Sequence, residues 1–228
     1  RAPTPRFMLS PSYGSVEPLD YPLWQAAGDW IRGRKYAVLT FDDGPYGDGV
    51  DEHILETLRR HHAPAIFFLV CSHLTAATMH VPDEISRGGH MIGNHRYDHR
   101  HLTRLDAKQL QHQIGDCSAR LASASGHRPR FFRPPFGETS AAVLHEILAA
   151  GMQQVLWDAN SEDSWLTRPD QVFYWSVKQT DNRSILLMHD KPSTAAVLDR
   201  VLTELEKRGF RFVLPDAAPT GTSAAPPR

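Results

Sequence analysis

The chain has 228 residues, of which 41% are hydrophobic and 22% are charged, a composition typical of one soluble globular domain with a large core. Its formal net charge of -1 excludes a global electrostatic field that would recruit nucleic acid or an anionic membrane. We therefore expect no nucleic-acid partner. No apolar run approaches the roughly 18–20 residues that span a bilayer, so we expect no membrane span either.

The two ends of the chain differ in composition from its middle. Residues 1–34 contain five prolines and little periodicity, which predicts an irregular N-terminal arm that Trp24 and Trp30 could pin to the body. Residues 217–228 are rich in Pro, Ala, Thr and Gly and predict a disordered tail. One folded domain is expected between them, over residues 35–216. Because the chain starts at Arg1 rather than Met, we expect that a leader or further N-terminal sequence was removed.

Strand-like and helix-like segments alternate through this domain. Short apolar or β-branched runs predict strands at 36–41, 65–70, 90–93, 130–132, 154–157, 184–188 and 210–213. Apolar residues at helical spacing predict helices at 51–61, just before His90, and at 105–122, 139–150, 168–179 and 193–208. This repeated β-then-α order predicts an α/β fold with a parallel sheet and outer helices, as either a barrel or an open doubly wound sheet.

Polar side chains follow these predicted strands at the points where the strands end. The set comprises Asp42, Asp43, His95, Arg133, Asp158 or Asp163, and His189. The carboxyl ends of parallel strands meet at one face, which is where barrels build their active sites. No Gly-rich dinucleotide or phosphate-binding pattern follows the first strand, which argues against a Rossmann or NTPase fold.

Two pairs of residues, Asp42 with Asp43 and His95 with His99, have the composition of a metal site. Asp42 and Asp43 either form part of a solvated turn or are two carboxylates on opposite sides of a strand. In the second case one carboxylate can bind a metal while the other accepts a proton. His95 and His99 are four residues apart, which on a helical turn places both imidazoles on one face and excludes His101. Thirteen His residues make chance spacing the alternative. Two imidazoles and a carboxylate suit Zn²⁺, and also Co²⁺ or Ni²⁺.

Two further segments allow both a structural and a catalytic interpretation. The stiff run Arg133-Pro-Pro-Phe-Gly137 is either a simple turn or a rigid wall that fixes Arg133 and a backbone N–H for an oxyanion. His189 ends a buried strand and is either a core residue with its hydrogen bonds satisfied or a general acid.

The two cysteines, Cys71 and Cys117, are either two buried thiols, the interpretation we favour, or one disulfide.

Together these pieces resemble the polysaccharide deacetylase family, also called the NodB-homology domain or carbohydrate esterase family 4. The resemblance covers about residues 36–215 and rests on five motifs in the family's order. They are Thr40-Phe-Asp-Asp-Gly-Pro45, Gly89-His-Met-Ile-Gly-Asn-His-Arg-Tyr-Asp-His99, Arg133-Pro-Pro-Phe-Gly137, Trp157-Asp-Ala-Asn-Ser-Glu-Asp-Ser-Trp165 and Leu187-Met-His189.

The resemblance implies a distorted (β/α) barrel with about seven parallel strands and a role for each matched residue. It implies a catalytic base at Asp42, an acid at His189, metal ligands at Asp43, His95 and His99, supporting residues at Arg133 and Asp163, an oxyanion N–H at Phe136, and an acetyl pocket formed by Pro135, Trp165 and Leu187. The implied reaction is metal-dependent hydrolysis of the N-acetyl group of an N-acetylglucosamine-type sugar in a glycan. An exported monomer acting on chitin oligomers, peptidoglycan or an exopolysaccharide is expected.

The chain departs from the family's pattern at three places, and other functions stay open. Arg96 stands where the family usually has Ser or Thr, and we expect Asp98 or the neighbouring acids to pair with it. The Asp163-Ser-Trp165 segment is one residue longer than usual, and Phe136 replaces the usual Tyr. The alternatives are a deformylase or other amidohydrolase acting on a non-polymeric amide, an O-acetyl esterase acting on xylan, and a glycan-binding module without catalysis.

Overall fold

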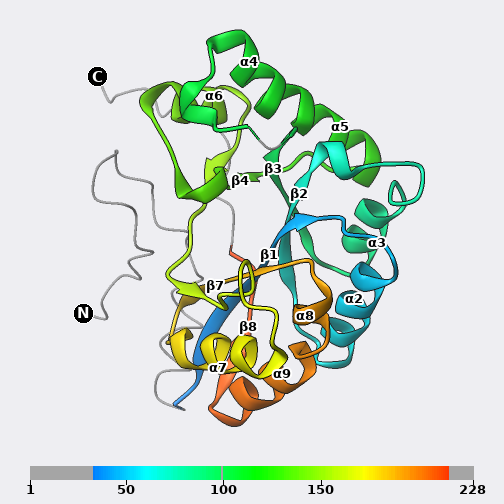
Figure 1. The fold of residues 1–228 in the computed structure, drawn as a ribbon, viewed down its shortest axis with the longest axis vertical. Helices are drawn as coiled ribbons and strands as arrows, with labels where there is room; N and C mark the ends of the chain where they lie inside the picture. The colour runs from blue at the N-terminus through cyan, green and yellow to red at the C-terminus, as the bar shows by residue number, and fades with distance from the viewer. Residues whose placement is uncertain (1–32, 99, 216–228) are drawn as a thin grey trace, which may run out of the picture.

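The computed structural model describes residues 33–98 and 100–215, and its centre is one sheet of parallel strands (Figure 1). Among these residues the strands are β1 (Lys35–Gly44), β2 (Ala65–Val70), β3 (Met91–Arg96), β4 (Phe131–Phe132), β5 (Gln153–Gln154), β6 (Ala159–Asn160), β7 (Ser184–His189) and β8 (Phe210–Phe212). They pair in the order β5-β4-β3-β2-β1-β7-β6, and β8 pairs with the start of β1. The sheet curls into a half-barrel, which confirms the predicted distorted (β/α) barrel. The predicted arm, with Trp24 and Trp30, and the predicted tail lie outside the described residues.

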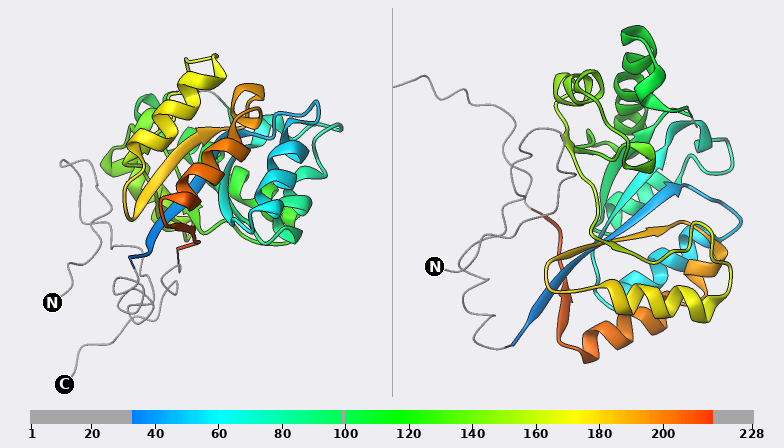
Figure 2. Two further views of the ribbon diagram at one scale, coloured as in Figure 1. Left: turned by 90° about the horizontal axis from the view of Figure 1, so that it is seen from below. Right: turned by 60° about the vertical axis from the view of Figure 1, so that its left-hand side comes forward.

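Helices enclose this sheet from outside (Figure 2). They are α2 (Val50–Arg60), α3 (Val81–Arg87), α4 (Ala107–Gln111), α5 (Cys117–Ser125), α6 (Ala141–Ala149), α7 (Pro169–Gln179), α8 (Pro192–Ala195) and α9 (Leu198–Lys207). In Figure 1, α7 and α9 pack together at one end of the molecule, while α4, α5 and α6 lie at the other. None of the helices in the described part of the chain is long and apolar enough to cross a membrane.

Strand β1 separates two cores by alternating its side chains. Leu39 and Phe41 belong to the cluster that the outer helices cover, together with Ile54 of α2. Val38 belongs instead to a cluster within the curl of the sheet, with Phe68 among its members. Side chains alternate along a strand, so the even-numbered positions of β1, through to Asp42, face the inside of the half-barrel.

The predicted helix at 105–122 is divided by a π-helical turn (His112–Asp116) between α4 and α5. Asp106 caps its start by accepting the Gln109 N–H at 2.9 Å. The π-helical turn contains the buried Gln113, whose Oε1 accepts the N–H groups of Tyr97 and Asp98 at 3.1 and 3.0 Å. The π-helical turn therefore holds the chain at Tyr97 and Asp98, directly after the end of β3. A repeat of apolar residues does not reveal such a turn, because the apolar stripe continues through it.

Two other predicted elements differ in extent. The strand expected at 154–157 is limited to β5 (Gln153–Gln154), and Val155 belongs to the inner core without continuing the strand. The helix expected at 193–208 is divided into α8 and α9 around Ala196 and Val197. In both cases the prediction rested on a run of apolar residues, which indicates that the side chains are buried. Burial does not specify where the backbone hydrogen bonds of a strand or helix begin and end.

Cys71 and Cys117 form a disulfide with a Cα–Cα distance of 5.6 Å. This result contradicts the favoured interpretation of two buried free thiols and supports the alternative. The bond joins the residue that follows β2 to the first residue of α5, and both cysteines are fully buried. Because Val70 pairs with Arg96 in register, the bond lies beside the end of β3.

Candidate active site

Asp42 and Asp43 end β1 with an irregular backbone. Asp43 has φ 68°, in the left-handed region that a non-glycine residue rarely adopts, and the pairing with β2 shifts between Asp42 and Gly44. Both carboxylates therefore lie near one imidazole, with Asp43 Oδ1 3.4 Å and Asp42 Oδ2 3.8 Å from His95 Nε2. The prediction that the two side chains point to opposite sides is wrong, because the left-handed residue breaks the alternation of the strand.

Arg133 holds Asp42 from the inside of the half-barrel. Its Nη1 donates to Asp42 Oδ1 and to Thr40 Oγ1, both at 2.7 Å, and its side chain is fully buried. Nη2 donates to the Leu156 carbonyl at 3.1 Å, and the guanidinium lies 4.2 Å from the centre of the Phe68 ring. This geometry fixes one oxygen of Asp42 and leaves Oδ2 directed toward His95. The predicted supporting role of Arg133 fits this position.

His95 lies in strand β3 and not on a helical turn, so the helical-face argument for His95 and His99 is wrong. The described chain bends at Tyr97 and Asp98, and His99 lies outside the described residues. His95 Nδ1 donates to the Arg133 carbonyl at 2.7 Å, which fixes the orientation of the ring and leaves Nε2 as the nitrogen that faces Asp43. The imidazole is thus oriented in the way that metal-ligating histidines usually are.

Asp43 and His95 fit two positions of a single metal ion. Their facing atoms are 3.4 Å apart, and two ligands with bonds of about 2.1 Å in tetrahedral geometry are separated by about 3.4 Å. Burial alone raises the pKa of Asp43, but the hydrogen bond and charge of His95, with the charges of His189 and Arg96, outweigh it and lower the pKa below its ordinary 3.8. A carboxylate of this kind stays ionised, as a ligand must.

His189 ends β7 and is held by Asp163. Its Nδ1 donates to Asp163 Oδ1 at 2.6 Å, its backbone N–H donates to Oδ2 at 2.7 Å, and the Thr194 hydroxyl donates to the same Oδ2. Burial alone lowers the pKa of His189, but the hydrogen bond and charge of Asp163, with the charges of Asp42 and Asp43, raise it above 6.5. Nε2 is directed toward Asp43, whose Oδ2 lies 4.0 Å away. A proton on Nε2 is therefore favoured and placed at the site.

The remaining predicted residues surround this centre unequally. Pro135 and Leu187 are buried, whereas the Phe136 and Trp165 side chains are 65% and 67% exposed. Phe136 has φ 58° within the 3₁₀ turn Pro135–Gly137, and its ring stacks on His101 with 5.1 Å between centroids. Trp165 Nε1 donates to Glu162 Oε2 at 2.7 Å. The acetyl pocket and the oxyanion N–H stay predictions.

Sequence reasoning missed Thr40, Thr194 and Asp190 as parts of the site. Thr40 is two residues before Asp42 on the same strand face, so alternation along β1 could have identified it. Thr194 is 31 residues from Asp163 in the chain, and no local pattern indicates their contact. Asp190 follows His189 directly and is 1% exposed.

Asp190 is a buried acid beneath the turn after Asp43. Its backbone N–H donates to the Asp42 carbonyl at 3.0 Å, while neither carboxyl oxygen has a hydrogen-bond partner among the described residues. A Cβ on Gly44 would come within 1.8 Å of Asp190 Oδ2, so this turn requires glycine. Burial, and then the charges of Asp51 and other nearby carboxylates, raise the pKa of Asp190 well above 3.8. The structure therefore favours its neutral form.

Replacing Asp190 with Asn is expected to stabilise the fold by an amount that grows with pH. The folded chain retains a proton that the unfolded chain releases above about pH 3.8, so wild-type stability falls as pH rises toward the folded pKa, by up to about 1.4 kcal/mol per pH unit. Asn carries no such proton. Urea unfolding of both proteins at about pH 5 and about pH 8 measures this difference. A difference that does not change with pH would contradict the neutral-acid assignment.

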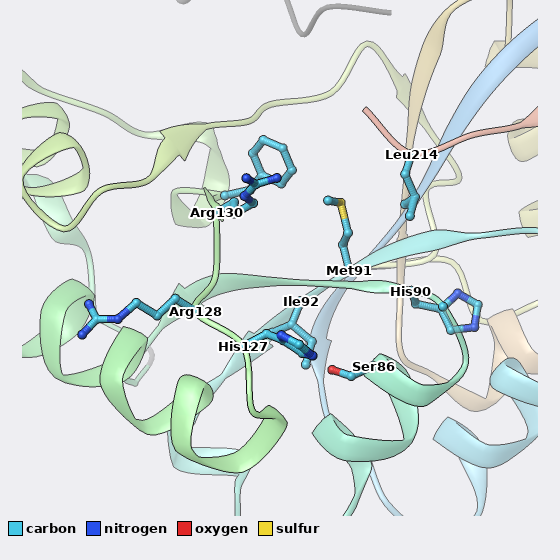
Figure 3. Close-up of a pocket in the computed structure, with 10 residues that line it drawn as sticks. Ser86, His90, Met91, Ile92, His127, Arg128, Arg130 and Leu214 are labelled. Carbon is cyan, nitrogen blue, oxygen red and sulfur yellow. The ribbon is translucent and has the colours of Figure 1, made fainter. Parts of the chain in front are cut away.

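Two other surface features lie apart from this centre. Glu52, His80 and Glu84 are exposed and form the one group of three converging carboxylate and imidazole donors found among the described residues, and none of them belongs to the predicted metal site. A hollow of about 460 Å³ lies at the opposite ends of the strands, beside Met91 and Arg130 (Figure 3). Neither feature includes any residue of the predicted active site.

Comparison with known proteins defines the family. The sequence profile described as "Polysaccharide deacetylase" matches residues 31–155. The chain is 35% identical over 188 residues to a peptidoglycan-N-acetylglucosamine deacetylase of Listeria monocytogenes, covering 81% of this chain and 39% of that protein. Thus the chain spans about two fifths of that relative's length. The chain belongs to the polysaccharide deacetylase family.

Solved structures share the fold. A family 4 carbohydrate esterase from Streptomyces lividans, in complex with acetate, has a TM-score of 0.73 at 30% identity, covering 79% of this chain and 92% of the esterase. A mutant with restored enzymatic activity of a CE4 family pseudoenzyme from Bacillus anthracis has a TM-score of 0.73 at 26% identity, covering 78% and 65%. The same fold therefore occurs in active and inactive members.

Proposed function

We propose that this chain is a metal-dependent hydrolase that removes the acetyl group from an N-acetylglucosamine-type residue of a glycan, releasing acetate and a free amine. The observation that carries the proposal is the convergence of carboxylates and imidazoles at one edge of the sheet. Asp43 lies between two imidazoles, with Oδ1 3.4 Å from His95 Nε2 and Oδ2 4.0 Å from His189 Nε2. Family membership and the peptidoglycan-N-acetylglucosamine deacetylase relative support the choice of reaction.

The metal ligands in this proposal are Asp43, His95 and His99, with Zn²⁺ as the leading ion and Co²⁺ or Ni²⁺ as alternatives. When bound, such an ion acts as a Lewis acid that polarises a water molecule and the acetamide carbonyl. Asp43 Oδ1 and His95 Nε2 have the separation that a shared ion requires. His99 is assigned from the sequence motif alone.

The chain's own groups move the protons. Asp42, oriented by Arg133, takes a proton from the water whose oxygen attacks the acetamide carbon, a role that contributes about 10²–10⁴-fold to the rate. The Phe136 backbone N–H donates to the developing oxyanion. As the C–N bond breaks, His189 Nε2 donates its proton to the leaving amine nitrogen. Asp163 holds Nδ1 of the same ring and stabilises its charged form.

We also propose that the protein is exported, acts on cell-wall glycan and is a monomer. The disulfide between Cys71 and Cys117 supports export, because such bonds persist in oxidising compartments and are rare in the cytosol. The Listeria relative, whose name refers to peptidoglycan, supports cell-wall glycan as the substrate. Light scattering on the purified protein measures its oligomeric state.

A substrate panel tests the proposed reaction. Zinc-loaded protein is incubated with chito-oligomers, peptidoglycan fragments, N-formyl amino sugars and acetylated xylan, and released acids and products are identified by mass spectrometry. Acetate with a product one acetyl group lighter, from a chito-oligomer or peptidoglycan, supports the proposal. Formate release or acetate from xylan alone would replace it with the deformylase or the O-acetyl esterase. Tight glycan binding without any released acid would indicate a binding module or a pseudoenzyme.

A further inference from the structure

Arg96 is a buried cation at the centre of the candidate site. It ends β3 directly after His95 and is 2% exposed. Its backbone has φ 131°, and its N–H donates to Asn94 Oδ1 at 2.9 Å. This hydrogen bond, together with the buried Asn94, turns the chain so that the Arg96 side chain points back toward the end of β1.

The guanidinium reaches the same oxygen atom that His95 approaches. Arg96 Nη2 lies 3.4 Å from Asp43 Oδ1, and His95 Nε2 lies 3.4 Å from that same Oδ1. Asp43 therefore pairs with Arg96 through the same oxygen that would bind a metal beside His95. Asp43, one of the neighbouring acids expected to pair with Arg96, forms this ion pair, and Asp42 and Asp98 also contribute favourable charge.

The surroundings keep the cation in this position. Arg96 Cζ lies over the exposed Phe136 ring, 6.0 Å from the ring centroid, and His101 stacks on the same ring. A guanidinium does not lose its proton in proteins, so its charge is permanent. Any divalent ion at Asp43 and His95 therefore lies within a few ångströms of a fixed positive charge, in a site where burial weakens solvent screening.

We propose that Arg96 sets the metal affinity of this site by competing with the ion for Asp43 Oδ1. The inference deepens the proposed function, since it assumes the same metal site. Arg96 neutralises Asp43 when the metal is absent and opposes metal binding by repulsion. A neutral Ser or Thr at this position would do neither. The chain is thus a weaker metal binder than a protein with the same three ligands and a neutral residue here.

Metal titration of the full chain tests the inference. The metal-free wild type, Arg96→Ser, Arg96→Gln and Arg96→Lys are titrated with Zn²⁺ by calorimetry, and with Co²⁺ by visible absorption. Both neutral variants are expected to bind Zn²⁺ about tenfold or more tightly than the wild type, because a nearby like charge is removed. Arg96→Lys keeps the charge and is expected to remain closer to the wild type. Arg96→Gln retains most of the side-chain length and covers the case in which the serine variant fails to fold.

A matched control and two further outcomes distinguish failure of the role proposed for Arg96 from failure of the proposed metal site. Arg100→Ser removes an exposed cation four residues away, whose ion pair is with Asp98 and not with Asp43, and its zinc affinity should match that of the wild type. Equal or weaker zinc affinity in both folded neutral variants would overturn the role of Arg96 and leave the proposed function intact. Absence of zinc binding in the wild type and in every variant would overturn both. Circular dichroism confirms that each variant is folded.

Discussion

Replacing Asp42 with Asn is expected to lower turnover about 10²–10⁴-fold while the bound metal is retained. Asn has nearly the same shape and can still accept a hydrogen bond from Arg133, whose Nη1 lies 2.7 Å from Asp42 Oδ1. It has no basic carboxylate, so it cannot take the proton of the attacking water. Acetate release from a chito-oligomer measures turnover, and elemental analysis measures the metal content of the same sample.

Two further variants control this experiment. His95→Ala is expected to lose both metal and turnover, because it removes the imidazole that faces Asp43. Asp158→Asn is expected to keep both, because Asp158 Oδ1 accepts the Ile185 N–H at 2.7 Å and an amide oxygen can do the same. Unchanged turnover in Asp42→Asn would show that Asp42 is not the base. Equal metal content in His95→Ala and wild type would remove His95 from the metal site.

The fold was largely predictable because burial leaves a periodic record in the sequence. The continuous apolar run at 65–70 became β2, with all six residues buried, and the amphipathic segment at 51–61 became α2. Parallel order followed from the alternation of such segments. The irregular parts were not predictable in the same way. The π-helical turn that contains Gln113 makes polar contacts with Tyr97 and Asp98, which lie 16 and 15 residues earlier in the chain, beyond the reach of a local repeat.

The site was predictable in its residue types but not in its backbone. Their positions at the carboxyl ends of predicted parallel strands placed Asp42, Asp43, His95 and His189 on one face, and the structure brings these four near one another. The backbone differs from the prediction at two residues. Asp43 has a positive φ, which the sequence did not indicate, and His95 lies on a strand instead of a helical turn. Spacing of four residues fits a helix and a bent strand equally well, so it could not decide between them.

The pairing of Cys71 with Cys117 could not be predicted from their spacing either, and the disulfide is expected to contribute strongly to stability. Their separation of 46 residues carries no information on distance in the fold. Parallel pairing of β2 with β3 and packing of α5 nearby bring them together. Once formed, the bond closes a long loop and thereby restricts the unfolded chain. Loop-closure entropy for 46 residues corresponds to about 4 kcal/mol at room temperature.

Replacing Cys71 and Cys117 together with Ala is therefore expected to lower the free energy of unfolding by about 3–4 kcal/mol. Alanine suits the fully buried positions better than serine, since a buried hydroxyl would add a cost of its own. Urea unfolding with linear extrapolation measures the change, and a reducing agent should destabilise the wild type but not the double variant. A loss below about 1 kcal/mol would contradict the prediction. Because the bond acts mainly on the unfolded chain, the zinc affinity of the folded double variant is expected to stay within about twofold of the wild type.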